Sequence, residues 1–462
     1  MFEPVRLRSA VTHPAPATAD AVASRTIENL IITLFWLVVL EGALRKWVAP
    51  EYSRYLFFLR DPIMLLVYWQ ALRLQALRNM GPLLQTGIAF SFVAILLAFV
   101  QSITFGDARL LPVLAYGWRQ YFFYLPLPFI MAATLNEASL IRFARHAFLA
   151  VMVNLPIVLL QRVSPASSII NRGIADDVAL QFQSFAFTGG GIRPSGTFTT
   201  TVGVKELIAS SAALLLGVWL TPPVRRRMSN LFLIVSAAAL AMCLAVSGSR
   251  AAFVHVSIVL VAALVLGLIS RSGTVRARAV LIPLVLVGSG VILYPIVFPD
   301  ALRDMLQRVS EAQAAEMRFS SLGIVGRALY EYVDFFSLMG QSPIAGYGLG
   351  LGGNGRTFIS AGAITPLGIP YAESDWSRHI VDLGPLIGVM FIVYRLWWVG
   401  WLAARSWRVS RLVDRAFPLL LLGYVGVGLL NGQLTGHGTV GGFLWIYLGL
   451  AMTSCRLPAA RR

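Results

Sequence analysis

The chain has 462 residues, of which 57% are hydrophobic and 13% are charged, with a mean hydropathy of +0.73. A soluble protein is roughly 45–50% apolar and about 25% charged, so this composition excludes a typical soluble enzyme, a disordered chain and a secreted disulfide scaffold. The net charge of +17 on so apolar a chain indicates lipid rather than nucleic acid as its partner, and two cysteines in apolar stretches predict neither a disulfide framework nor a cysteine metal site.

Membrane spans dominate the predicted structure. A span needs about 20 mostly apolar residues. Before the first span, residues 1–26 have no compact apolar core followed by a cleavage site, so we expect a flexible tail rather than a signal peptide. The twelve predicted spans are residues 27–43, 56–72, 84–104, 110–134, 146–161, 204–220, 230–248, 251–270, 279–298, 381–403, 416–433 and 438–455.

Basic residues set the predicted orientation. Every second connection is short and rich in arginine, which is typical of the cytoplasmic side. The expectation is therefore an all-α polytopic membrane protein with about 12 transmembrane helices and both termini in the cytoplasm. Its predicted parts are a tail at 1–26, spans 1–9 at 27–298 with an outer loop at about 162–203, a large extracytoplasmic loop at 299–380, spans 10–12 at 381–455, and a tail at 456–462.

The large loop at 299–380 is the expected place for chemistry, because long ordered loops usually carry function. Its apolar residues recur at helical spacing around 302–309 and again around 329–339, which predicts two helices on the outer membrane face or over a cavity. The glycine-rich run at 346–353 is open to two interpretations. It is either a tightly turned connector or a backbone cradle for a phosphate or a sugar.

Charged residues within or beside the spans are candidates for binding, because charge in a bilayer is costly. Arg60 and Asp61 lie within a span and are expected to neutralise charge there. Arg119 either snorkels or pairs with an acid, or it points into a substrate cavity. Arg250, after Ser247-Gly248-Ser249, is either an interfacial anchor or a ligand for an anionic headgroup. Arg327 either pairs with Glu331 one turn later or binds substrate.

A second polar cluster precedes the tenth span. The sequence Glu373-Ser374-Asp375-Trp376-Ser377-Arg378-His379 places two acids, an arginine, a histidine and a tryptophan beside the membrane surface. The cluster is either a polar collar with an interfacial tryptophan or part of a site, with Asp375, Arg378, His379 and Arg119 as substrate-binding candidates. Five scattered histidines make a metal centre improbable, and we expect no cofactor.

The order of these motifs resembles the O-antigen ligase and O-antigen polymerase superfamily of bacterial surface-polysaccharide enzymes. Three features carry the resemblance: Ser249-Arg250 opening a span, Arg327 followed by a loop helix and by a Pro343-to-Gly350 turn, and Glu373-Ser374 eleven residues before Gly384. The segment from Glu41 to Trp47, followed by Arg60-Asp61-Pro62, is similar to an N-terminal pattern in some ligase-like members. The resemblance extends over nearly the whole chain.

The resemblance implies a metal-independent, inverting glycosyltransferase with a GT-C-like fold in the bacterial inner membrane and an active site on the periplasmic face. Its donor would be a glycan on undecaprenyl diphosphate, polymerised into O-antigen or exopolysaccharide. Membrane lipid, a flippase and a chain-length regulator are the candidate partners. In this resemblance Arg250 and Arg327 correspond to diphosphate ligands, and Glu373 takes the place of the family's histidine as the general base.

Glu373 is a departure from the family pattern. A carboxylate can deprotonate a sugar hydroxyl, so the exchange can preserve catalysis, but the base could instead be Asp375 or His379. The departure favours a polymerase over a ligase that transfers finished glycan to lipid A–core. A polysaccharide or lipid transporter is the alternative of another class, although the chain shows no internal repeat of the kind that many transporters have.

Overall fold

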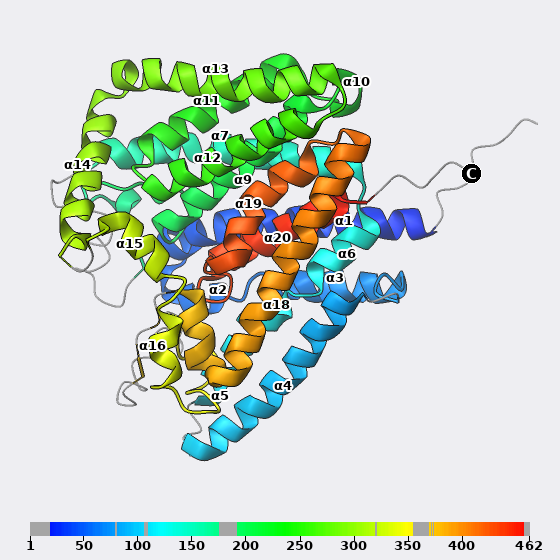
Figure 1. Cartoon of the computed structure of the whole chain (residues 1–462), viewed down its shortest axis with the longest axis vertical. Helices are drawn as coiled ribbons and strands as arrows, with labels where there is room; N and C mark the ends of the chain where they lie inside the picture. The colour runs from blue at the N-terminus through cyan, green and yellow to red at the C-terminus, as the bar shows by residue number, and fades with distance from the viewer. Residues whose placement is uncertain are drawn as a thin grey trace, which may run out of the picture.

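The computed structural model describes residues 19–78, 81–105, 110–174, 192–318, 321–353, 369–370, 372 and 374–456. The described residues form a bundle of helices, joined by short turns (Figure 1). Serine and asparagine side chains begin several of them. Ser249 and Ser374, for example, each accept a hydrogen bond from the backbone amide three residues later and so satisfy one free donor of the first turn.

The first half of the chain supplies α1 to α9. Its helices are α1 (Ala19–Ala43), α2 (Ser53–Leu56), α3 (Asp61–Arg73), α4 (Pro82–Phe105), α5 (Leu110–Trp118), α6 (Leu127–Thr134), α7 (Glu137–Val163) and α9 (Thr201–Leu220). Two π-helical turns, Leu44–Val48 and Arg119–Phe123, and two 3₁₀ turns, Pro50–Tyr52 and Ile169–Asn171, lie between them.

The second half supplies α10 to α20. Its helices are α10 (Pro223–Arg226), α11 (Asn230–Val246), α12 (Arg250–Ile269), α13 (Gly273–Val297), α14 (Pro299–Glu316), α15 (Gly323–Tyr330), α16 (Phe335–Met339), α18 (Asp375–Val413), α19 (Phe417–Asn431) and α20 (Gly438–Ser454).

Within the described ranges, seven helices are long and apolar enough to cross a membrane. They are Val22–Val48, Pro82–Thr104, Glu137–Val163, Thr201–Leu220, Arg250–Ile269, Gly273–Val297 and Asp375–Val413. Three shorter apolar helices, α11, α19 and α20, accompany them. These helices confirm the expectation of a helical membrane protein. The predicted spans at 56–72 and 110–134 coincide with shorter pieces, since α3 has 13 residues and a π-turn separates α5 from α6.

The core lies between α9, α19 and α20. The apolar window of α9 is 83% buried, whereas that of α13 is 6% buried, so α13 lies at the periphery with its apolar side chains facing outward. Outward-facing leucine and valine side chains are what a helix in contact with lipid presents. Figure 1 shows α13 along one edge of the molecule, followed by α14 and α15, which continue toward α16.

The loop layer made by α14, α15 and α16 joins α13 to the start of α18. The predicted helix around 302–309 is α14, whereas the stretch around 329–339 forms two short helices, α15 and α16. Phe335 and Leu338 of α16 pack on Ile380 and Val381 of α18. This contact fixes the end of the loop layer against the first turns of α18.

A kink divides α18 near its start. Gly384 has φ +81°, and a Cβ at this position would overlap the carbonyl oxygen of Ile344. Only glycine adopts this conformation readily, and Pro385 follows it. The kink therefore lets the glycine-rich run, which begins at Gly346, pack directly against the helix backbone.

Replacing Gly384 by alanine is expected to destabilise the protein by about 1–3 kcal/mol, because the new side chain meets both unfavourable backbone angles and a backbone oxygen. Thermal unfolding of the purified protein in detergent measures the effect. Gly400 of the same helix is the matched control, since a Cβ there has nothing within 4 Å and alanine is the better helix former. Equal melting temperatures for the two variants would contradict this account of the kink.

Candidate functional site

Three arginines from distant parts of the chain gather where α12 begins. Arg250 is the first residue of α12, Arg308 lies on α14, and Arg193 lies in the loop before α9. Arg308 donates a hydrogen bond to the carbonyl oxygen of Gly248, which connects α14 to the turn before Arg250. We call Arg193, Arg250 and Arg308 the arginine cluster.

The guanidinium groups of the arginine cluster lie close enough to influence one another electrostatically. Partial burial and the two neighbouring guanidinium groups lower the pKa of Arg308 to about 10. Burial, with a further contribution from Arg250, also lowers the pKa of Arg193. Arg250 thus acts on Arg193, and both act on Arg308, as like charges do at short range, so an anion bound among them would be stabilised.

Two nitrogens of the arginine cluster also lack hydrogen-bond acceptors. Nη1 of Arg250 and Nε of Arg193 are buried and have no hydrogen-bond partner in the described part of the chain. Buried polar groups are nearly always paired, and an unpaired charged donor is expensive. The N-terminus of α12 adds its partial positive charge at the same place. The cluster therefore has the features of an anion site, and guanidinium forks suit phosphate oxygens.

The loop that carries Arg193 is held by buried hydrogen bonds. Lys46 donates to Ser195 Oγ at 3.0 Å and to the Gly196 carbonyl oxygen at 2.8 Å. The amide of Gly196 donates to Gln161 Oε1 at 2.7 Å, and the amide of Thr197 donates to the side chain of Asn154. These bonds tie the residues after Arg193 to the π-helical turn that follows α1 and to α7, and so fix the position of Arg193.

The other predicted diphosphate ligand, Arg327, lies on α15 and contacts the last residue of α14. Its Nη1 is 2.8 Å from Glu316 Oε1, in a pair that is partly exposed. Glu316 is eight residues beyond Arg308, which is about 12 Å along a helix. Arg327 thus forms an ion pair with Glu316, and the length of α14 between Glu316 and Arg308 separates it from the arginine cluster.

Glu373, the predicted general base, lies outside the described residues. Its neighbour Ser374 donates to Asp334 Oδ1 at 3.0 Å, and Trp376 packs edge-on against Tyr332 and Phe335. These contacts hold the start of α18 against the segment that follows Arg327. The structure therefore brings the segment after Arg327 to the chain beside position 373.

The predicted substrate-binding residues Asp375, Arg378 and His379 are buried together in α18, and each residue is only 0–2% exposed. Asp375 forms ion pairs with Arg378 and with Arg395, the latter at 2.9 Å, and accepts a hydrogen bond from Thr435. Each charge in this group is therefore met by other side chains of the bundle.

His379 continues this buried network toward α5. Arg395 Nη1, which can only donate, lies 2.9 Å from His379 Nε2, so Nε2 accepts and Nδ1 carries the proton. Nδ1 then donates to Tyr121 Oη at 2.8 Å, and the Tyr121 hydroxyl donates to Asp382 Oδ2 at 3.0 Å. This chain of donors holds a neutral imidazole in one tautomer.

Asp382 also explains the glycine-rich run. The amide of Gly352 donates to Asp382 Oδ1 at 2.7 Å, and the amide of Tyr347 donates to the carbonyl oxygen of Val381. The run thus wraps around a carboxylate of its own chain at the kink of α18. This arrangement favours the turned connector over a cradle for a substrate phosphate.

Arg119 is buried in a second network, on the N-terminal side. It forms a two-pronged pair with Asp61, both contacts being 2.6 Å, and Tyr124 donates to the same carboxylate. Arg60 pairs with Glu41 at 2.9 Å instead of with its neighbour Asp61. Each of these charged side chains has a partner on another segment. Of the interpretations that the sequence left open for Arg119, the structure shows the ion pair with an acid.

His437 was not singled out from the sequence. It precedes α20, and its Nε2 lies 3.2 Å from Thr200 Oγ1, while Nδ1 has no hydrogen-bond partner in the described ranges. Burial lowers the pKa of His437 to about 4, so the imidazole is neutral at neutral pH. Lys205, Glu206, Arg60 and Arg378 lie close enough to influence its charge.

Arg193 and Arg308 were likewise missed. The sequence places Asp304 four residues before Arg308, which looks like an ordinary helical pair, but Asp304 forms its ion pair with Arg162 of α7. An arginine in each long outer loop was the available signal. Among the described residues, no three His, Cys, Asp or Glu side chains are grouped as a metal site would require.

No protein-family model matches this chain, and no curated protein matches it significantly.

Proposed function

We propose that the protein is a membrane glycosyltransferase that polymerises lipid-linked repeat units on the outer face of the bacterial inner membrane. In this proposal the twelve predicted spans form a GT-C-like bundle, and the donor is a glycan on undecaprenyl diphosphate. The observation that supports it most is the arginine cluster, because Arg193 and Arg250 each have a buried nitrogen without a hydrogen-bond partner among the described residues, and guanidinium groups suit a diphosphate.

The chemistry assigned to the site is a single displacement. An acceptor hydroxyl attacks the anomeric carbon of the donor, the bond from that carbon to the phosphate oxygen breaks, and the configuration inverts. Glu373 takes the hydroxyl proton. Arg250, with Arg193 and Arg308, stabilises the negative charge that grows on the departing lipid diphosphate, and Arg327 holds the distal part of the donor.

The buried networks have a supporting part in this proposal. Asp375, Arg378 and His379 are engaged with one another and with Arg395, so we assign them to holding the first turns of α18, which follow Glu373 directly. Arg119 has the same task for the N-terminal segments. In this proposal these residues do not touch the substrate; they position the backbone of the segments that carry the residues which do.

The direct test is an elongation assay with purified protein and lipid-linked repeat units, with a chelator present and no nucleotide sugar. We expect longer lipid-linked products, resolved by mass spectrometry or by gel. Transfer only to added lipid A–core would make the protein a ligase. Substrate movement across vesicles without glycan transfer would make it a transporter, and either result would overturn the proposed polymerase activity.

Replacing Glu373 by glutamine in the same assay is expected to lower turnover by about 10²-fold, because the variant cannot take the proton. Binding of the lipid-linked donor should change little, since glutamine keeps the size and polarity of the side chain. His437→Gln is the matched comparison, as His437 is a neutral imidazole. If the Glu373 variant turns over normally and the His437 variant does not, the general base is His437 and the assignment to Glu373 is wrong.

A further inference from the structure

A cavity lies at the opposite end of the bundle from the arginine cluster. Ser270, just after α12, donates to Asp414, just after α18, at 2.7 Å, so the C-terminal ends of these helices lie together. Arg250 is at the other end of α12, which at 20 residues is about 30 Å long. The cavity is therefore separated from the proposed active site by about the length of a membrane span.

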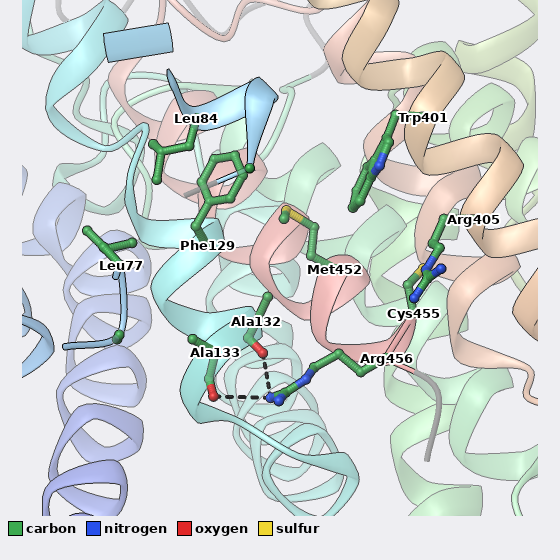
Figure 2. Close-up of a pocket in the computed structure, with 12 residues that line it drawn as sticks. Leu77, Leu84, Phe129, Ala132, Ala133, Trp401, Arg405, Met452, Cys455 and Arg456 are labelled. Carbon is green, nitrogen blue, oxygen red and sulfur yellow. Dashed lines mark hydrogen bonds between the residues drawn. The ribbon is translucent and has the colours of Figure 1, made fainter. Parts of the chain in front are cut away.

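The cavity measures about 410 Å³ and lies between α6, the end of α18 and the end of α20 (Figure 2). Its apolar side chains are Leu84 and Phe129 on one side, with Trp401 and Met452 across from them. Two arginines lie next to these apolar residues. The cavity thus has an apolar part and a cationic part, which is the pattern of an amphiphilic ligand.

The two arginines are Arg405 and Arg456, and no acidic residue is among the residues that line the cavity. Arg456 donates from Nη1 to the carbonyl oxygens of Ala132 and Ala133, at 2.6 and 3.1 Å, which fixes it at the end of α6 (Figure 2). No described residue accepts a hydrogen bond from its other side-chain N–H groups, which can donate to a ligand. Arg405 makes no hydrogen bond or ion pair with the residues that the structure describes.

The surroundings place the cavity at the edge of the membrane. Trp401 is 36% exposed, on a helix whose preceding turns present apolar side chains such as Val393 and Met390 outward. Tryptophan and arginine at the end of an apolar helix are typical of the depth of the lipid headgroups.

We propose that this cavity binds an anionic glycerophospholipid, with the phosphate between Arg405 and Arg456 and an acyl chain along Leu84 and Phe129. Basic pockets between membrane helices are suited to such headgroups. A zwitterionic lipid should bind less well, because its ammonium group would lie beside two arginines with no carboxylate in the cavity wall to receive it.

The test compares phosphatidylglycerol with phosphatidylcholine on the full-length protein, by native mass spectrometry from detergent. We expect wild type to retain phosphatidylglycerol preferentially, and Arg405→Gln to reduce that preference by about tenfold, as the loss of one charge-assisted contact would. Arg405 has no described partner to lose, so the variant should melt as wild type does. Arg408→Gln, an exposed arginine on the same helix outside the cavity, should behave as wild type.

Three results would overturn the proposal. Wild type could retain both lipids equally, or Arg408→Gln could reduce the preference as much as Arg405→Gln, which would indicate a general effect of surface charge. Excess inorganic phosphate could also displace the lipid fully, which would indicate a site for a free anion. The elongation assay reports on the other end of the bundle, so failure of either proposal is distinguishable from failure of the other.

Discussion

Arg250→Ala is expected to lower the turnover of lipid-linked repeat units by about 10²–10³-fold, the usual effect of removing one preorganised donor to a developing oxyanion. The expectation follows from the position of Arg250 at the first turn of α12, with a buried nitrogen that has no described partner. Its charge is uncommitted within the described part of the protein, so removing it should cost the fold little while removing a ligand of the leaving group.

Single-turnover elongation, with donor binding measured separately, checks this result. Arg250→Lys should recover only part of the rate, since an ammonium group keeps the charge but lacks the planar fork that matches a diphosphate. Arg303→Ala is the control, because Arg303 lies on α14 in a pair with Asp300 that is 76–81% exposed. If Arg250→Ala turns over substrate at the wild-type rate, the proposal that the arginine cluster stabilises the leaving group is wrong.

Asp375→Asn is expected to destabilise the protein by about 3–5 kcal/mol, because it leaves two buried arginines without their carboxylate. Asp375 is fully buried and pairs with both Arg378 and Arg395, which are themselves 2% exposed. An amide in place of the carboxylate can accept hydrogen bonds but cannot neutralise either guanidinium. We expect a strongly lowered melting temperature and a reduced yield of folded protein.

Thermal unfolding in detergent measures this effect, and Asp300→Asn is the matched control. The Asp300 pair with Arg303 is exposed and 3.4 Å long, so its loss should change stability by less than about 1 kcal/mol. A folded Asp375→Asn protein with normal melting and weakened donor binding would instead assign Asp375 to the substrate, as its sequence context first suggested.

Helix positions could be predicted from the sequence because each helix carries its own signal in apolar residues and caps. The predicted spans at 84–104, 204–220 and 251–270 lie within α4, α9 and α12 with small differences at their ends. The predicted span at 110–134 was less accurate. A π-turn at Arg119–Phe123 divides it into α5 and α6, and no local pattern marks such a turn before the packing of Arg119 against Asp61 is known.

Candidate residues could be predicted individually, but not their partners. Arg60 and Asp61 are adjacent, yet they pair with Glu41 and Arg119 on separate segments. Arg193 and Arg250 are 57 positions apart and meet only because the loop after Arg193 is anchored by Lys46. Contacts of this kind depend on how helices pack, and they cannot be predicted from the spacing of residues along the chain.

The helix α14 has a thermodynamic consequence for any anion that enters the arginine cluster. It supplies Arg308 at one point and Glu316, the partner of Arg327, two turns later. An anion held by both Arg308 and Arg250 stabilises the docked position of α14. Docking of α14 in turn raises the affinity for the anion, and the two effects have the same free energy. Occupancy of the cluster and protection of α14 from proteolysis or hydrogen exchange should then rise and fall together.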